Sequence, residues 1–435
     1  MTHRVRLRDE FKQVKEEIAT SFITNVRRPL SGFEGFIVLA FMLLFFACIL
    51  LGLSSLLRTG FLVDRFVFSL LFERVYFGIS IYFVGFTIAL LVFVVQYLKA
   101  HGYMKSPLVF RILIFLLFSG LLLLPPYLII RVHVSPFVTG VVLLFSTSLF
   151  LKCFSYIRSC RLLCLYSLNR IPHPFPHLNN PKEDSIWSSP LDTVSFPQVV
   201  RFRNFLYFLC APTFVYQPSF ELIEKRNLNL IVERFILLIS GCVVCYLVFV
   251  QFLSPVLEHS DIKDLTPLKL IHLVLQLLIP ANIVWLLGFF IIFFCGLNIT
   301  AEVLRFKDRN FYGSWWNSST LNRFWSDWNT LTHQWLKTHV YCEGRQTFGI
   351  SRMNSSLLTF IVSAFFHEFI MASAFQVFRP YFFIGIVLQS VCIPISIKIG
   401  TKYPIIGNVI VWLNLIVGQP LITVLYFAEY YRTRR

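Results

Sequence analysis

The 435-residue sequence predicts an all-α polytopic membrane protein with about nine transmembrane helices. Three observations predict this class. Hydrophobic residues make up 56% of the chain and charged residues only 14%, as in proteins whose surface faces lipid. The apolar residues form long runs, and a run of about 20 residues crosses the roughly 30 Å of hydrocarbon in a bilayer. The basic residues gather in short loops between these runs.

The first 32 residues combine basic side chains, such as Arg4 and Lys12, with apolar residues at helical spacing, such as Val14 and Ile18. We expect residues 1–32 to form a cytosolic amphipathic segment on the membrane surface or against a partner subunit, with a frayed tail as the alternative. This charged segment contains no apolar core of a cleavable signal peptide. The first apolar run should therefore act as an uncleaved anchor.

The transmembrane helices divide into two groups. Four are expected within 33–157, a cytosolic loop follows at 158–230, and a catalytic core is expected at 231–431. The proline pair Pro125-Pro126 should kink or shorten the third helix. The expected spans are approximately 33–57, 76–98, 110–130, 137–157, 231–255, 270–297, 354–377, 381–399 and 405–428.

The loop charges indicate how the chain crosses the membrane. Its net charge is +17, and placing the N-terminus in the cytosol puts most basic residues on the cytosolic side. This distribution indicates topology and not a nucleic-acid partner. A basic cytosolic face also favours an anionic substrate head group.

The segment 298–353 differs from an ordinary loop, because five of the eight tryptophans lie between residues 315 and 335. Tryptophan combines an apolar ring with a polar N–H, which suits a membrane interface. Interface anchoring does not account for the interleaved Asn, Asp and His residues. We expect 298–353 to form short helices that lie on the cytosolic face or dip into it as a re-entrant segment.

His367 lies in the apolar run 357–371, with Glu368 beside it. Ionisable groups near the middle of a membrane helix cost about 2.5 kcal/mol or more, so they usually face a protein interior or a wet cavity. A polar pair that ties two helices together is one interpretation. Direct general-base catalysis is the other, because no serine or cysteine nucleophile motif accompanies the histidine.

The sequence does not predict a metal site. The zinc motif HExxH fails because Met371 follows His367-Glu368. His333 and His339 are six residues apart, which places them on different faces of a helix. We interpret the ten cysteines, most of which lie in apolar runs, as small apolar fillers.

An intramembrane base suits a lipid alcohol as acceptor. Such a molecule leaves the bilayer at a cost of about 0.8 kcal/mol per CH₂. The enzyme must therefore place its base at the depth of the acceptor hydroxyl.

Several motifs, in this order, resemble those of membrane-bound O-acyltransferases, in the branch of sterol acyltransferases and type 1 diacylglycerol acyltransferases. The similarity runs from about 200 to 431. Its motifs are Ala211-Pro212-Thr213 with Tyr216-Gln217, Phe311-Tyr312-Gly313-Ser314-Trp315-Trp316-Asn317 against the family's FYxDWWN, then Trp328-Asn329, His333-x-Trp335 and Ser363-Ala364-Phe365-Phe366-His367-Glu368.

The resemblance implies acyl transfer from acyl-CoA to a lipid hydroxyl in the endoplasmic reticulum, with acyl-CoA as co-substrate and no other cofactor. It implies the family fold, whose helices surround an intramembrane reaction chamber with a cytosolic opening for CoA and a lateral opening for lipid. It also suggests a homodimer or homotetramer.

The resemblance assigns roles to individual residues. His367 matches the catalytic histidine, Asn329 its polar partner, and Glu368 is expected to set the orientation or charge of the histidine. The expected substrate-binding residues are Phe311, Tyr312, Trp315, Trp316, Asn317, Trp328, His333, Trp335, Gln389 and Gln419.

Two departures from the family pattern stand out. Ser314 replaces the family's Asp, and Phe220-Glu221 replaces the expected Tyr-Pro-Arg. Gln389 and Gln419 resemble chamber positions of the diacylglycerol enzymes and favour diacylglycerol over sterol as acceptor. A sterol O-acyltransferase remains the alternative within the family. A proton-coupled membrane transporter with a His367-Glu368 relay is the alternative of another class.

Overall fold

The computed structural model describes residues 71–168, 196–259 and 266–434, together with a few helical residues between 46 and 57. The chain divides into two compact units, Met1–Val63 and Asp64–Arg435, and the helices named below belong to the second. The expected amphipathic segment 1–32 lies outside the described residues, as does most of the first expected span.

The described residues contain eight helices that are long and apolar enough to cross a membrane, which confirms the eight later spans. Two of them continue through short π-helical segments, η4 and η5. The bounds are α5 Val75–Ala100, α6 Pro107–Val132, α7 Pro136–Ser167, α9 Leu228–Val248 with η4 Phe249–Leu253 and α10 Ser254–His259, α11 Pro267–Phe289 with η5 Phe290–Gly296 and α12 Leu297–Val303, α16 Arg352–Phe375, α17 Tyr381–Lys402 and α18 Pro404–Arg434.

Several of these helices begin at a Ser-Pro or Thr-Pro pair. The side chains of Ser106, Ser135 and Thr266 each accept a hydrogen bond from a backbone N–H in the first turn, and proline follows at the first helical position. The side chain satisfies a donor that has no partner in the helix, while proline supplies a helical φ. Local sequence therefore defines where these helices start.

Two regions differ from the sequence-based expectation. Of the two effects expected at Pro125-Pro126, shortening does not occur, because helix α6 continues to Val132; neighbouring helices and local adjustments tolerate proline in membrane helices. The region 158–230, expected to be a loop, contains the last turns of α7 and the helix α8, Phe202–Cys210. Helix α8 forms because one of its faces, with Phe205 and Phe208, packs into the core shared with α5 and α7.

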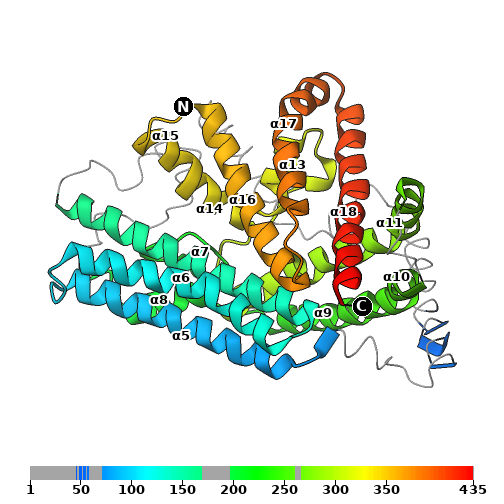
Figure 1. Ribbon diagram of the computed structural model, residues 1–435. Coiled ribbons are helices and arrows are strands. Elements are labelled where there is room, and N and C mark those ends of the chain that lie inside the picture. Colours follow the sequence, from blue (N-terminus) through cyan, green and yellow to red (C-terminus); the bar gives the residue numbers. More distant parts are fainter. Residues whose placement is uncertain are drawn as a thin grey trace. The chain divides into compact units, whose positions relative to one another are not determined.

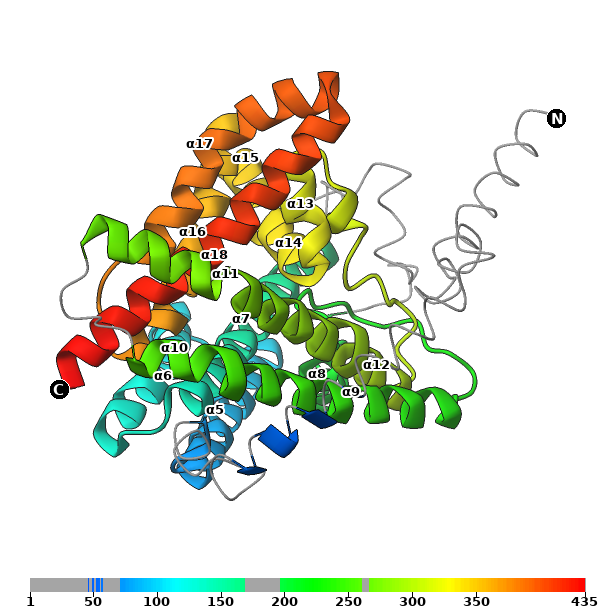
Figure 2. The ribbon, with the colours of Figure 1, turned by 90° about the vertical axis from the view of Figure 1, so that its right-hand side faces the viewer.

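Helices α5, α6 and α7 pack against one another, and α16 packs on α7 (Figure 1). Helix α16 also packs on α17, which in turn packs on α18 (Figure 1). Helix α11 contacts both α9 and α18 (Figure 2). Helix α16 therefore connects the α5–α7 group with α17 and α18.

The segment 298–353 folds into short helices, as expected. They are the 3₁₀ turn η6 Trp315–Asn317, α13 Leu321–Trp328, α14 Thr330–Leu336, the π-helical η7 Lys337–Cys342 and α15 Glu343–Thr347. Helix α13 packs against α17, and η7 packs against α16. The tryptophan-rich segment is thereby placed beside the helix that carries His367.

Candidate active site

His367 lies on the face of α16 that turns toward the tryptophan-rich segment. Phe365, two residues earlier and about 200° around the helix, is 51% exposed and marks the outer face. Phe360, seven residues earlier and so on the same face as His367, has its ring 6.3 Å from that of Trp325 in α13. His367 remains exposed although the ring of Phe382 packs against its imidazole, so part of the residue stays accessible.

One hydrogen bond determines which nitrogen of His367 carries the proton. Nδ1 lies 2.8 Å from the backbone oxygen of Ser363, one turn earlier. A carbonyl oxygen can only accept, so Nδ1 is the donor and bears hydrogen. In the neutral imidazole, Nε2 then holds a free lone pair. This tautomer is the one that a general base requires.

Glu368 leaves the helix about 100° away from His367 and points to the junction of α16, α17 and α18. One carboxylate oxygen accepts a hydrogen bond from the hydroxyl of Tyr426 in α18. The other accepts from the backbone N–H of Phe383 in α17, at 3.0 Å. Glu368 thus contacts the neighbouring helices, while Phe382 of α17 contacts the imidazole, with ring centroids 6.2 Å apart.

The tryptophans of the segment 315–328 form a buried aromatic cluster with α11 and α18. Trp328 stacks on Trp285 of α11, with ring centroids 4.5 Å apart and an interplanar angle of 12°. Trp315, only 4% exposed, lies 4.9 Å from Trp328 and 5.8 Å from Trp412 of α18. We infer that the packing of these rings fixes the position of the tryptophan-rich segment in the site.

Phe311 and Tyr312 belong to a second cluster beside α11. Phe311 is buried, whereas Tyr312 is partly buried and places its ring 5.0 Å from that of Phe289. Burial raises the pKa of the Tyr312 hydroxyl, so it stays protonated and able to donate.

The end of this motif is anchored through its backbone. The backbone oxygen of Trp316 accepts hydrogen bonds from Asn408 Nδ2 at 3.1 Å and from Trp412 Nε1 at 3.2 Å. The side chains of Ser314 and Asn317 are exposed. Polar groups of α18 therefore hold the motif, while these two side chains stay accessible.

Asn329 lies at the junction of α13 and α14. Its Oδ1 accepts a hydrogen bond from the backbone N–H of Thr332 at 3.0 Å and so caps α14. Within the described part of the chain, its Nδ2 makes no hydrogen bond, and none joins Asn329 to His367. The cap leaves the N–H groups of Nδ2 available to an incoming oxygen atom.

His333 and Trp335 of α14 lie in different surroundings. His333 keeps an accessible surface, while the protein groups packed around its ring desolvate it and lower its pKa, followed by the charge of Lys337. Trp335 is buried and donates from Nε1 to the backbone oxygen of Leu151 in α7 at 2.9 Å. Trp335 therefore joins α14 to α7, and His333 is the accessible member of the pair.

The two candidate glutamines differ in their partners. Gln389 of α17 accepts a hydrogen bond from Trp325 Nε1 at 2.9 Å, which ties α17 to α13. Gln419 Oε1 in α18 is buried and has no hydrogen-bond partner among the described residues. Gln419 is thus an unsatisfied acceptor within the helix bundle.

Four residues that contribute to the site were not singled out from the sequence, namely Tyr426, Phe382, Trp285 and Trp412. Each comes close to its partner only through packing between helices, and no fixed spacing connects Tyr426 with Glu368. The one available signal was a large side chain with a polar atom inside an apolar run, as at Trp412.

No group of three or more His, Cys, Asp or Glu side chains in the described ranges is placed to hold a metal ion.

Comparison with known proteins identifies similar sequences. Residues 144–428 match the model of the membrane-bound O-acyltransferase family. Diacylglycerol O-acyltransferase 1 of Homo sapiens is 31% identical over 301 residues, which cover 68% of this chain and 59% of that protein.

Two further relatives have similar sequences and carry the same kind of name. Diacylglycerol O-acyltransferase 1C of Glycine max is 32% identical over 348 residues, which cover 78% of this chain and 63% of the relative. Diacylglycerol O-acyltransferase 1 of Dictyostelium discoideum is 30% identical over 275 residues, which cover 62% of this chain and 44% of the relative. The chain thus spans less than two thirds of the length of each of these three relatives.

Proposed function

The chain belongs to the membrane-bound O-acyltransferase family, and from this premise we propose that it transfers an acyl group from acyl-CoA to the hydroxyl of diacylglycerol. The product is triacylglycerol. The observation that carries the proposal is the tautomer of His367, because its free Nε2 belongs to an exposed histidine on the face of α16 that carries Phe360, in a multi-pass membrane protein.

In the proposed reaction, Nε2 of His367 accepts the proton of the acceptor hydroxyl while the oxygen attacks the thioester carbonyl. The tetrahedral intermediate carries a negative oxygen, to which Nδ2 of Asn329 donates a hydrogen bond. The C–S bond then breaks, and the sulfur takes the proton from the imidazolium. An ester and free CoA result, and the neutral imidazole is restored.

Diacylglycerol is favoured as acceptor by the polar groups that α17 and α18 supply. Gln389 and the unsatisfied Gln419 can hydrogen-bond to the ester carbonyls and hydroxyl of a glycerolipid, whereas a sterol offers one hydroxyl. The names of the relatives point to the same acceptor.

The decisive assay uses the purified full chain in detergent with labelled oleoyl-CoA. Diacylglycerol, cholesterol and ergosterol are offered separately, and labelled ester is measured. Labelled triacylglycerol is expected. Preferential formation of steryl ester would overturn the assignment of diacylglycerol as the acceptor. Absence of every ester would favour the transporter alternative, which needs two compartments to show activity.

The variant His367→Ala tests the base. General-base catalysis typically contributes about 10²–10⁴ in rate, so we expect the initial rate of ester formation to fall by at least about 10². His101→Ala at the end of α5 is the control, because His101 lies outside the site. An active, folded His367→Ala enzyme would contradict the mechanism.

We further propose an endoplasmic reticulum location and a homodimer or homotetramer, both supported by the family resemblance. Fractionation of cells that express the tagged chain tests the location. Light scattering of the purified protein, corrected for bound detergent, tests the oligomeric state. A monomer with full activity would overturn the proposal that the enzyme works as a homodimer or homotetramer.

A further inference from the structure

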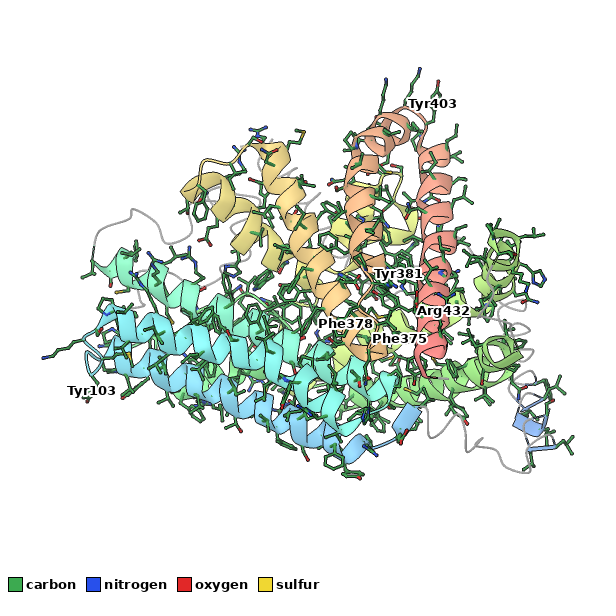
Figure 3. The ribbon with its side chains drawn as sticks, viewed as in Figure 1. Tyr103, Phe375, Phe378, Tyr381, Tyr403 and Arg432 are labelled. Atoms are coloured by element: carbon green, nitrogen blue, oxygen red, sulfur yellow. The ribbon has the colours of Figure 1, made fainter. Side chains whose placement is uncertain are left out.

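The ends of three helices meet next to His367. Helix α16 ends at Phe375, α17 begins at Tyr381, and the last turns of α18 pass beside both. Figure 3 shows Phe375, Tyr381 and Arg432 gathered at this junction, while Tyr403 lies at the opposite end of α17. The base is therefore close to a junction whose geometry depends on all three helices.

Glu368 provides the cap of α17. The residue before this helix is Pro380, whose side chain makes no capping hydrogen bond. Phe383 is the third helical residue, and its N–H has no acceptor within the helix. Glu368 accepts from it at 3.0 Å. A carboxylate at a helix N-terminus is also favoured by the helix dipole, so Glu368 attaches the start of α17 to α16.

Tyr426 holds the other oxygen of the same carboxylate. Its side chain is fully buried, and its ring packs against Phe375 at 5.6 Å, Tyr381 at 5.4 Å and Phe382 at 6.0 Å between centroids. A ring confined on these sides has little freedom to turn, so its hydroxyl stays beside the carboxylate of Glu368 and the backbone oxygen of Arg379, 3.0 Å away, which also accepts from it. Tyr426 thereby sets the position of Glu368.

The first turn of α17 then acts on the base. Phe382, directly before the capped Phe383, lies nearly parallel to the imidazole of His367, at an interplanar angle of 23°. The other restraint on the imidazole is the hydrogen bond from Nδ1 to Ser363. Together these contacts determine the plane of the ring and the direction of Nε2.

We propose that Tyr426 is a positioning residue for the acyl transfer, which holds His367 in its reactive orientation through Glu368 and the first turn of α17. This inference rests on the proposed function. It assigns Glu368 to the same chain of contacts, so the carboxylate acts on the imidazole through α17 and not by a direct hydrogen bond.

A matched control lies in the same cluster. Tyr381 also donates to a glutamate, Glu429, at 3.4 Å, and its ring packs against that of Tyr426. Its hydroxyl does not contact Glu368. Tyr381→Phe therefore removes the same hydroxyl chemistry nearby but leaves the contacts from Tyr426 to His367 in place.

The first experiment measures kcat and KM of the full-length enzyme for Tyr426→Phe, Glu368→Gln, the double variant and Tyr381→Phe. A small misplacement of a catalytic group can cost up to about 10² in rate. We expect kcat to fall about tenfold or more in Tyr426→Phe, with KM for oleoyl-CoA and the melting temperature nearly unchanged. Tyr381→Phe should keep the wild-type kcat.

The double variant tests whether Tyr426 acts through Glu368. Residues in one hydrogen-bonded network show non-additive effects. The kcat of the double variant should therefore be only slightly lower than that of Glu368→Gln alone. Additive losses, a wild-type kcat in Tyr426→Phe, or an equal loss in Tyr381→Phe would each overturn the inference.

A second measurement does not depend on turnover. Nitrogen-15 spectra of the histidine-labelled protein report which ring nitrogen bears hydrogen, and the His367 signals are those missing from His367→Ala. We expect a single Nδ1-protonated form in the wild type and in Tyr381→Phe, and a mixture of tautomers in Tyr426→Phe. An unchanged spectrum in Tyr426→Phe overturns the inference. A protein that makes no ester but shows the expected spectra would contradict only the proposed function.

Discussion

The helix itself supplies the hydrogen-bond acceptor for Nδ1 of His367, the proposed base. Ser363 lies one turn before it, and its backbone oxygen accepts the Nδ1 hydrogen. Side chains four residues apart share a helix face, so this arrangement needs no distant partner. The sequence therefore supplied the acceptor for Nδ1, whereas the plane of the ring also depends on Phe382 of α17.

Asn329 combines two roles that one substitution can separate. Its Oδ1 caps α14, while Nδ2 is the proposed donor to the tetrahedral intermediate. Asn329→Asp keeps a capping oxygen but has no N–H, so kcat should fall by about 10²–10³ with nearly unchanged melting temperature. Kinetics and thermal melting of the purified protein provide the two measurements.

Asn329→Ala is the matched comparison. It removes the donor and the cap together, and loss of a cap typically costs about 1 kcal/mol. We therefore expect a lower melting temperature in Asn329→Ala than in Asn329→Asp. Equal turnover of Asn329→Asp and the wild type would exclude Nδ2 as the donor.

His333 should make stability depend on pH. Its pKa in the folded protein lies below the ordinary value of 6.5, mainly through burial. Below pH 6.5 the unfolded chain therefore binds the proton more readily than the folded one. The stabilisation by neutral His333 is complete above pH 6.5 and is lost as pH falls through the lowered pKa.

The measurement compares melting temperatures of the wild type and His333→Gln across this pH range. The wild type should lose more stability than the variant as the pH decreases from 6.5. Because the variant keeps every other titrating group, the difference between the two curves isolates His333. Parallel curves would show that its protonation is not coupled to folding.

At the scale of helices, hydropathy predicted the eight later spans because each must cover the hydrocarbon thickness by itself. The residues at which the helices end were less predictable. Helix α7 continues to Ser167 because Cys160 and Leu163 pack in the core with α8. That packing partner follows a long stretch of chain, so local composition did not reveal it.

Two glycines allow the loop after η6 to approach the turn between α17 and α18. A Cβ added at Gly400 would lie 2.0 Å from the backbone oxygen of Ser319, and one at Gly407 would lie 2.2 Å from it. Gly400→Ala should therefore displace this loop. Overpacking typically costs about 1–3 kcal/mol, so a lower melting temperature and slower ester formation are expected.

Gly288→Ala in α11 is the control for this substitution. A Cβ at Gly288 would have no atom within 4 Å, and alanine is the better helix former. Its melting temperature should match or exceed that of the wild type. If Gly400→Ala behaved in the same way, the close approach of Ser319 would not matter for the fold.

At the scale of the molecule, the tryptophan-rich segment is held by helices from distant parts of the chain. Trp285 of α11 and Trp412 of α18 both contact Trp315, and Asn408 binds the backbone of Trp316 and Ser318. The sequence predicted short helices in this segment but not their partners. Aromatic rings pack on any suitable apolar surface, and only the fold determines which one is adjacent.

The sequence by itself determined the membrane class, the later spans and the histidine at membrane depth, because these follow from properties that each segment carries locally. It also indicated the candidate residues through their resemblance to a family. Only the tertiary structure decided that His367 turns inward and that Glu368 contacts Tyr426 and Phe383. The physical reason is that a carboxylate among apolar helices binds whichever donors the packing of those helices brings within reach.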